Sequence, residues 1–182
     1  MRSAVFQTIL VAIDSTEISH KAFYSALTAA KALNAELMIV HILGVQESDS
    51  PQPPDTYSTS EMVVIDKALR EQYQKDWNNY VARYDALLKQ KAEEAQAIGI
   101  QASCIHAHGS APKAICKLAR EHNVNLIVLG SHQRRGVAEL MMGSTSNYVM
   151  HHAPCSVLIV HPDIEIEVTA APRQKKSTVG VG

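Results

Sequence analysis

Short runs of apolar residues recur along the chain, and each is separated from the next by a stretch with helical spacing. The first run, 8–13, is Thr followed by five residues drawn from Ile, Leu, Val and Ala. A continuous apolar run of this length is typical of a strand that is buried on both faces. Strands that alternate with helices form a mainly parallel sheet, with right-handed crossovers and helices on both faces. The sequence therefore predicts an α/β protein.

The remaining elements follow from the same two patterns. Further strands are predicted at 36–43, 101–107, 125–129 and 154–160. Helices are predicted at 17–33, 61–97 and 144–151, with another that opens at Ser110. The segment Asp14–Glu17 has the spacing of a capping box, so the first helix is expected to start there. The helix at 61–97 exceeds the usual length, which predicts a break or an overhang.

One domain is expected over residues 1–161, because typical domains have roughly 100–200 residues and the chain has 182. Within that domain, residues 45–60 are rich in Pro and Ser and fit no period, so we expect a long mobile loop. Residues 162–182 also lack a period. We expect this tail to be disordered or docked on a partner.

Charge and hydropathy exclude several classes of protein. Lys and Arg number 17 against 18 Asp and Glu, so the chain lacks the positive charge of a general nucleic-acid binder. No apolar run approaches the roughly 18 residues of a membrane span, and no leader peptide is recognised at the start. The three cysteines are widely spaced and fit a reducing compartment. A cytoplasmic protein without membrane or nucleic-acid partners is expected.

The segment from Gly130 to Thr145 leaves a strand, crosses a loop and enters a helix at Gly143 and Ser144. The first amides of a helix are unpaired and carry the positive end of its dipole, and glycine lets backbone approach a phosphate closely. Ser144 and Thr145 add hydroxyl donors. Two interpretations fit these residues alone: an anion cradle, or a glycine turn with a capping serine.

Signals for catalysis and for metal binding are weak. The sequence contains neither the P-loop pattern nor the G-x-S-x-G nucleophile elbow. The nine histidines form no ligand set with recognisable zinc spacing, and His41 lies within a buried strand, where a hydrogen-bonded core role is expected. No catalytic residue and no metal ligand is therefore assigned, and slow ATP hydrolysis is the most that we expect.

Four segments, in the right order, resemble the universal stress protein family. Its nucleotide-binding signature is G-x2-G-x9-G-[ST], and Gly130, Gly143 and Ser144 stand at the first, third and fourth positions. The segments 8–15, 109–115 and 125–130 are also similar to that family, and the likeness extends over roughly residues 7–161.

The resemblance implies a Rossmann-like, doubly wound, parallel five-stranded sheet with strand order 3-2-1-4-5. It implies a stress-response homodimer formed through the last strand, at Val157, Leu158, Ile159 and Val160. It also implies binding of ATP or another adenine nucleotide, with or without Mg²⁺. Carried over residue by residue, the family's site assigns Asp14, beside Ser15, to the ribose and Gly143, Ser144 and Thr145 to the phosphates. The remaining positions around the nucleotide are Ala12, Ile42, Leu129, Gly130, His132, Gln133 and Arg134.

Gln133 departs from the family's pattern, because it occupies the position of the second signature glycine. A side chain there either crowds the phosphates or sends the loop along another path. Arg134 and Arg135 either pair with phosphate or face solvent. Asp14 has a second role open to it as a helix cap. Two alternatives therefore stand beside the nucleotide-binding module: a dimer that acts by protein contact alone, and a weak ATPase.

Overall fold

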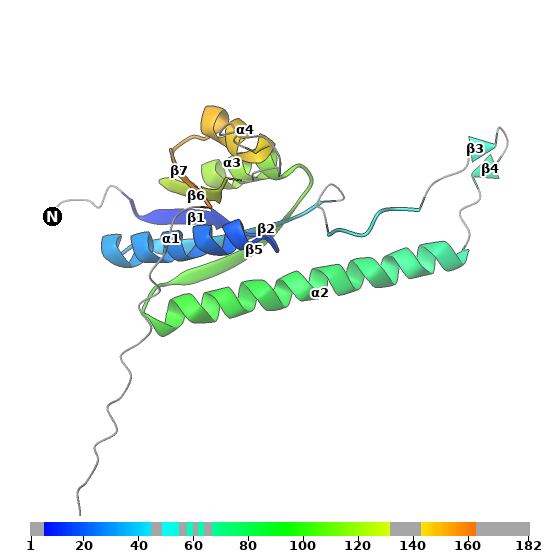
Figure 1. Ribbon diagram of the computed structural model, residues 1–182, viewed down its shortest axis with the longest axis horizontal. Helices are drawn as coiled ribbons and strands as arrows, with labels where there is room; N and C mark the ends of the chain where they lie inside the picture. The colour runs from blue at the N-terminus through cyan, green and yellow to red at the C-terminus, as the bar shows by residue number, and fades with distance from the viewer. Residues whose placement is uncertain are drawn as a thin grey trace, which may run out of the picture.

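The computed structural model describes residues 6–44, 49–54, 58–59, 62–63, 67–131 and 143–162. In this part of the chain, strands alternate with helices as predicted, and Figure 1 shows the helices on either side of a twisted sheet. The strands of the main sheet are β1 (Thr8–Ala12), β2 (Glu36–Leu43), β5 (Ala102–His108), β6 (Leu126–Gly130) and β7 (Ser156–Val160). The helices are α1 (Glu17–Leu33), α2 (Lys67–Ala97), α3 (Ala111–Glu121) and α4 (Ser144–His152).

The main sheet has the order β5-β2-β1-β6-β7, and every neighbouring pair is parallel. Numbered along the chain among themselves, these strands read 3-2-1-4-5, so the predicted doubly wound α/β fold is confirmed. The order reverses beside β1, the first strand. In open sheets of this kind, ligands bind beyond the carboxyl ends of the strands at such a switch point.

Alternate residues of each central strand serve two separate cores. Ile9 and Val11 of β1 pack with α1 and with the carboxyl half of α2. Leu10 of β1 and Ile127 of β6 pack with α3 and α4 on the opposite face. This alternation follows from the twofold period of a strand, and it explains why the buried strands are apolar at nearly every position.

The first helix begins at Glu17 as predicted, but its N-cap is Thr16 rather than Asp14. Thr16 is the N-cap of α1, and its side chain accepts from the backbone N–H of Ser19. Asp14 does not cap the helix itself but accepts a hydrogen bond from the backbone N–H of Thr16. Asp14 therefore orients Thr16, and Thr16 caps the helix. At the other end, Asn34 adopts the left-handed conformation with φ 53°, which ends the helix as predicted.

The second helix starts at Lys67, and the predicted start at Glu61 is wrong. Residues Met62–Val63 form strand β4, which pairs antiparallel with β3 (Ser58–Thr59) inside the stretch 45–60. Residues 63–65 are Val, Val and Ile, and β-branched side chains favour strands over helices. The spacing of apolar residues suggested a helix from Glu61, but the β-branched residues of this segment favour a strand.

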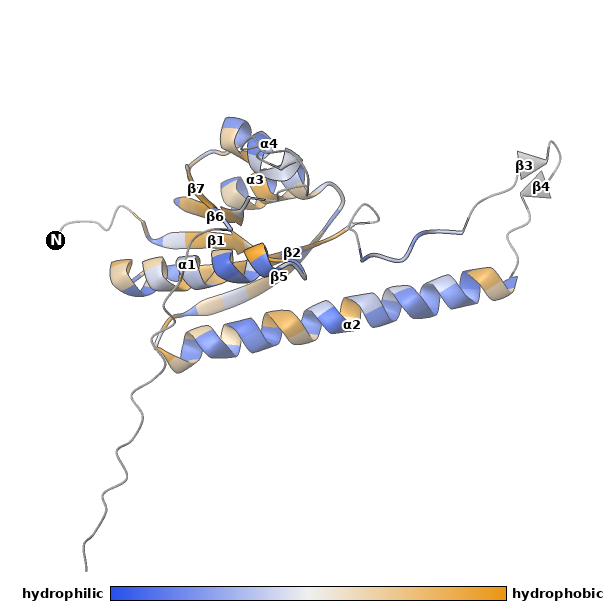
Figure 2. Ribbon diagram, viewed as in Figure 1, coloured by the Kyte–Doolittle hydropathy of each residue, from blue (hydrophilic) through white to orange (hydrophobic). Residues whose placement is uncertain are grey.

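The predicted overhang of α2 is confirmed, and no break interrupts the helix. Its carboxyl half packs on the sheet through Tyr84, Leu88 and Ala95, whereas Leu69 near its start is 54% exposed. Figure 1 shows the first half extending beyond the sheet, and Figure 2 shows that most of this helix is hydrophilic. Among the described residues, no helix has the length and hydropathy needed to cross a membrane. The tail at 163–182 lies outside the described residues.

Candidate functional site

The end of β1 lies between β2 and β6. On one side the backbone N–H of Ile13 donates to the carbonyl of Val40 at 2.8 Å. On the other side the register pairs Val11 with Val128, so that Gly130 ends β6 close to where β1 ends. Asp14 therefore leaves the sheet at the switch point of the strand order, the position from which a side chain reaches a ligand in this class of fold.

Only one oxygen of the Asp14 carboxylate has a recorded partner among the described residues. Its Oδ1 atom accepts from the backbone N–H of Thr16 at 2.8 Å and from the Thr16 hydroxyl at 2.5 Å. The Asp14 backbone N–H donates to Ser19 Oγ at 2.8 Å. These bonds fix the carboxylate at the start of α1 while Oδ2 remains able to accept from a hydroxyl group. The capping and ligand-binding roles of Asp14 are thus compatible.

Gly130 is required by packing against α1. A Cβ atom at this position would lie 2.8 Å from Ile18 Cγ1 and 3.0 Å from the Ile18 carbonyl oxygen. The carbonyl of Gly130 accepts from Ser146 Oγ at 2.9 Å, and Ser146 is buried. Helix α4 is therefore attached to the end of β6 close to its own N-terminus.

The start of α4 offers backbone donors rather than side-chain caps. Gly143 is the N-cap, with φ −55° and ψ 153°, and no side-chain capping bond is recorded there. Ser144 is exposed and Thr145 half-buried, and the first amides of a helix have no acceptor within the helix itself. Because φ is negative at Gly143, the backbone there does not need glycine.

The other predicted site residues separate into three groups. Ile42 and Leu129 are buried in the core beneath α3 and α4, so their side chains are largely unavailable to a ligand, and half-buried Ala12 packs against the same core. Ser15 is exposed beside Asp14. His132, Gln133 and Arg134 lie outside the described residues, as does Arg135.

A polar and aromatic cluster lies on the other face of β2, between that strand and α2. His41 is 1% exposed and is hydrogen-bonded at both ring nitrogens, to Ile13 O at 2.9 Å and Tyr80 Oη at 3.2 Å. The predicted core role of His41 is therefore confirmed. Burial is the main cause that lowers the pKa of His41 below its ordinary value.

The outer part of this cluster contains a tyrosine and three charged residues. The Tyr84 hydroxyl and the Arg83 guanidinium both donate to Asp49 Oδ2 at 2.7 Å. Burial also raises the pKa of Tyr84 to about 12. On β5, His106 Nε2 pairs with Asp85 Oδ1 at 2.7 Å. The Asp49 contacts attach the chain after β2 to the middle of α2, and the His106 contact attaches β5 to the same part of the helix.

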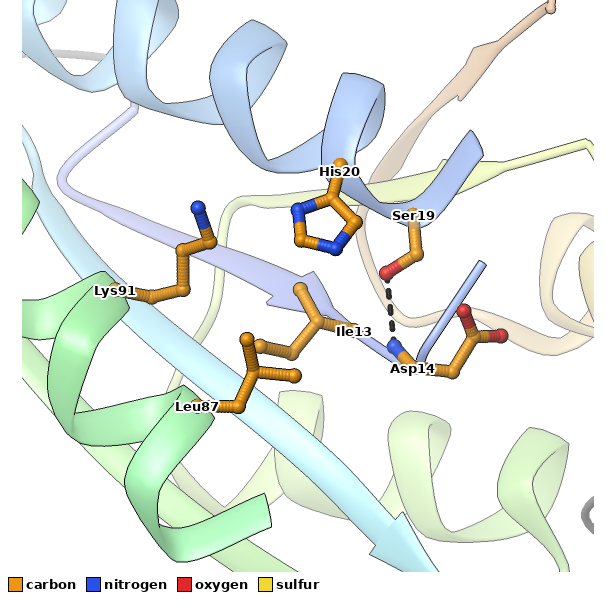
Figure 3. A pocket seen from close by; sticks show the side chains of 6 residues that line it. All are labelled: Ile13, Asp14, Ser19, His20, Leu87 and Lys91. Atoms are coloured by element: carbon orange, nitrogen blue, oxygen red, sulfur yellow. Dashed lines mark hydrogen bonds between the residues drawn. The ribbon is translucent and has the colours of Figure 1, made fainter. Parts of the chain in front are cut away.

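A narrow hollow between α1 and α2 adjoins the candidate ligand site, and Asp14 is among the residues that line it. Figure 3 shows its lining, which combines apolar side chains with Lys91 and His20, and the Ser19 to Asp14 hydrogen bond. In that view the Asp14 carboxylate points away from Leu87 and Lys91. Lys91 is buried against Glu94 at 3.0 Å, so its charge is balanced within the helix pair.

Sequence reasoning missed Ser19 and Ser146. Each is a buried serine on the third residue of its helix, where the hydroxyl reaches back to a neighbouring strand end. The sequence offered little signal, because a serine in a first turn can equally bond to the unpaired amides of its own helix. The specific partners, Asp14 N and Gly130 O, depend on the tertiary arrangement.

The chain is similar to known proteins over nearly all of its described length. A family model described as the universal stress protein family matches residues 6–161. Universal stress protein YxiE of Bacillus subtilis is 33% identical over 156 residues, which make up 86% of this chain and 99% of that protein. Universal stress protein Sll1388 of Synechocystis is 28% identical over 84% of this chain and 96% of that protein.

Solved structures share the fold. The universal stress protein UspA of Lactobacillus plantarum superimposes with a TM-score of 0.65 at 24% identity, covering 87% of this chain and 99% of that one. A universal stress protein in complex with cAMP gives 0.60 at 24% identity, covering 87% and 98%. The Arabidopsis thaliana protein with bound AMP gives 0.53 at 15% identity, covering 85% and 91%.

Proposed function

Because the chain belongs to the universal stress protein family, we propose that it is an adenine-nucleotide-binding module that acts as a homodimer in the response to stress. The nucleotide lies across the carboxyl ends of β1, β2 and β6. Its ribose meets Asp14, and its phosphates meet the start of α4 at Gly143, Ser144 and Thr145. The bound AMP and cAMP of the two related structures support this class of ligand.

The observation that carries the proposal is the state of the Asp14 carboxylate. Thr16 engages Oδ1 twice, which orients the group, and Oδ2 is left as an acceptor. A ribose presents hydroxyl donors, and a hydrogen bond to an ionised carboxylate is stronger than one between neutral groups.

The phosphate end of the proposal rests on α4. This helix has nine residues, begins without a side-chain cap, and is held to β6 through Ser146 and Gly130. Unpaired amides and the helix dipole favour an anion at this position. Arg134 and His132 are proposed as further phosphate contacts, and Ala12, Ile42 and Leu129 as backbone neighbours of the base. Mg²⁺ is proposed to bind only together with a nucleoside triphosphate.

The first experiment identifies the ligand. Protein purified under native conditions is extracted with acid, and the extract is analysed by mass spectrometry. Calorimetry then compares ATP, AMP and cAMP on the parent protein and on the Gly143→Val variant. Valine accepts the extended backbone at Gly143 without strain, so the fold should persist while binding is abolished. Met150→Val, at an exposed position of the same helix, is the matched control.

A second experiment separates the nucleotide-binding module from a dimer that acts by protein contact alone. Gln133 favours that alternative, because it replaces a signature glycine. The Gln133→Gly variant is titrated with ATP beside the parent. A gain of more than about tenfold, or about 1.4 kcal/mol, would mean that Gln133 obstructs the pocket. Equal affinities would mean that the loop accommodates both the glutamine and the phosphates.

The dimer is proposed through β7, an edge strand of the main sheet. Its residues Val157, Leu158, Ile159 and Val160 are apolar, yet Leu158 is 41% exposed. An edge strand presents unpaired backbone groups, and an apolar side chain on such an edge is typical of a contact surface. A cytoplasmic location is also proposed. It is supported by the family resemblance and by the three cysteines, none of which forms a disulfide.

A further inference from the structure

At the end of β1, a side chain of β2 forms the hydrogen bond that a backbone N–H group of β2 would be expected to form. The Nδ1 atom of His41 lies 2.9 Å from the carbonyl oxygen of Ile13, and the side chain is completely buried. Ile13 is the last residue before Asp14. The imidazole therefore contacts the peptide group that joins the sheet to the candidate ribose-binding residue.

The ladder between β1 and β2 shows why this contact is unusual. Paired residues run from Thr8 and Glu36 to Ala12 and Val40, and the Ile13 N–H still donates to Val40. In a parallel ladder the Ile13 carbonyl would next accept from the backbone N–H of Ile42. Its recorded partner is the imidazole. The side chain thus ends the ladder and leaves the backbone of β2 at Ile42 free to diverge from β1.

The imidazole is itself fixed from the side of α2. Its Nε2 atom lies 3.2 Å from the Tyr80 hydroxyl, and its ring stacks on Tyr84 with centroids 3.5 Å apart and an angle of 6°. A carbonyl oxygen only accepts, so the Nδ1 atom carries a proton. Burial lowers the pKa of His41, which favours the neutral ring, in which Nε2 accepts from the Tyr80 hydroxyl.

We propose that His41 is a positioning residue for the nucleotide site: it holds the Ile13 carbonyl and so fixes the backbone that presents Asp14. This inference rests on the proposed function of the site. It extends that function to a residue that touches no ligand and links the site to α2. A buried imidazole needs hydrogen-bond partners in any case. The identity of the partner supports the proposed role, because the bonded carbonyl belongs to the residue directly before Asp14.

The test uses three variants of the full chain. His41→Asn keeps an N–H donor at the place of Nδ1, whereas His41→Leu fills the space without a donor. Ile39→Val, a buried change on the same strand and face, is the control for a loss of packing alone. Each variant is checked by circular dichroism and urea unfolding, and then studied in two ways.

The first readout needs no ligand. Amide hydrogen exchange is followed by NMR at Ile13 and Asp14, whose N–H groups are bonded to Val40 O and Ser19 Oγ. His41→Leu should speed exchange at both amides by about tenfold relative to Ile39→Val, the effect of one hydrogen bond. His41→Asn should stay within about threefold of the parent protein by the same reasoning.

The second readout is the affinity for AMP, measured by calorimetry. His41→Leu should bind about tenfold more weakly, while His41→Asn and Ile39→Val bind like the parent. Unchanged exchange in His41→Leu overturns the proposal, and so does faster exchange with unchanged affinity. If the parent protein binds no adenine nucleotide, the proposed function fails, and the exchange rates alone decide whether His41 holds the end of β1.

Discussion

Ser146 Oγ donates a hydrogen bond of 2.9 Å to the carbonyl oxygen of Gly130, and thereby joins α4 to the end of β6. Ser146 is buried and Gly130 is half-buried. The bond fixes the start of α4, with Gly143 and Ser144, relative to the strand ends. Two parts of the candidate site that are distant in sequence are thus held by one side chain.

Replacing that serine should affect both stability and binding. Ser146→Ala leaves the Gly130 carbonyl without its donor, which should lower the free energy of unfolding by about 1–2 kcal/mol. Because the start of α4 is then less constrained, ATP affinity should fall by about threefold to tenfold. Urea unfolding and calorimetry measure the two effects. Asn147→Ala, at the exposed neighbouring position, should change neither, and equal losses in both variants would refute the role of this bond.

The close approach of β6 to α1 predicts the cost of a methyl group at Gly130. In Gly130→Ala the new Cβ would meet Ile18 Cγ1 at 2.8 Å and the Ile18 carbonyl at 3.0 Å. Overpacking of this kind costs about 1–3 kcal/mol, as measured by urea unfolding. In a double-mutant cycle, Ile18→Ala removes the first clash but not the second, so it should recover only part of the loss. Full additivity of the two changes would contradict this packing.

Asp14 should show two separable roles. Asp14→Ala removes the acceptor for the Thr16 N–H and hydroxyl, which should cost about 1 kcal/mol of stability, and it also removes the proposed ribose contact. Asp14→Asn keeps an oxygen for Thr16 but loses the negative charge. We therefore expect near-parental unfolding with weakened AMP binding in Asp14→Asn, and losses of both in Asp14→Ala. Parental AMP affinity in both variants would exclude a ribose contact at Asp14.

Much of the fold could be predicted because the decisive information is local. The strand at Glu36–Leu43 is apolar at every position except Glu36 and His41, and Asn34 and Gly99 mark the ends of the two long helices. The start of α2 could not be placed from spacing alone. The first half of α2 is largely exposed, so the apolar residues spaced along it do not contact the sheet and do not indicate where the helix begins.

The parts of the candidate site that lie at strand ends and helix starts could be predicted from the sequence. Asp14 follows a buried strand and Gly143 precedes a helix, so the topology alone brings both to the same edge of the sheet. The contacts that hold them are long-range. Ser146 meets Gly130 across 16 positions, and His41 meets Ile13 across 28, and no sequence spacing encodes those pairs.

The buried imidazole of His41 predicts how stability depends on pH. Burial lowers its pKa in the folded protein below the ordinary 6.5, so between these two pKa values the unfolded chain binds more protons. Stability is then complete above pH 6.5 and declines as pH falls toward the folded pKa, with a slope of at most about 1.4 kcal/mol per pH unit.

The measurement compares urea unfolding of the parent and His41→Asn from pH 7.5 to 5. The other histidines and the carboxylates are common to both proteins, so the difference between the two curves isolates His41. The charged neighbours that act on His41 are His106, Asp49 and Asp14. The parent should lose more stability than the variant on acidification. Parallel curves would mean that His41 titrates alike in the folded and unfolded chain.

The exposed apolar edge of β7 predicts how the proposed dimer can be separated. Leu158 is 41% exposed on this edge strand, so Leu158→Glu should scarcely affect folding of the single chain while placing a charge in the contact. Analytical ultracentrifugation should then find a monomer where the parent protein forms a dimer. Met150→Glu changes a side chain that is 44% exposed on α4, and it should leave the dimer intact. A dimer that survives Leu158→Glu unchanged would exclude β7 as the contact, because a buried unpaired carboxylate costs several kcal/mol.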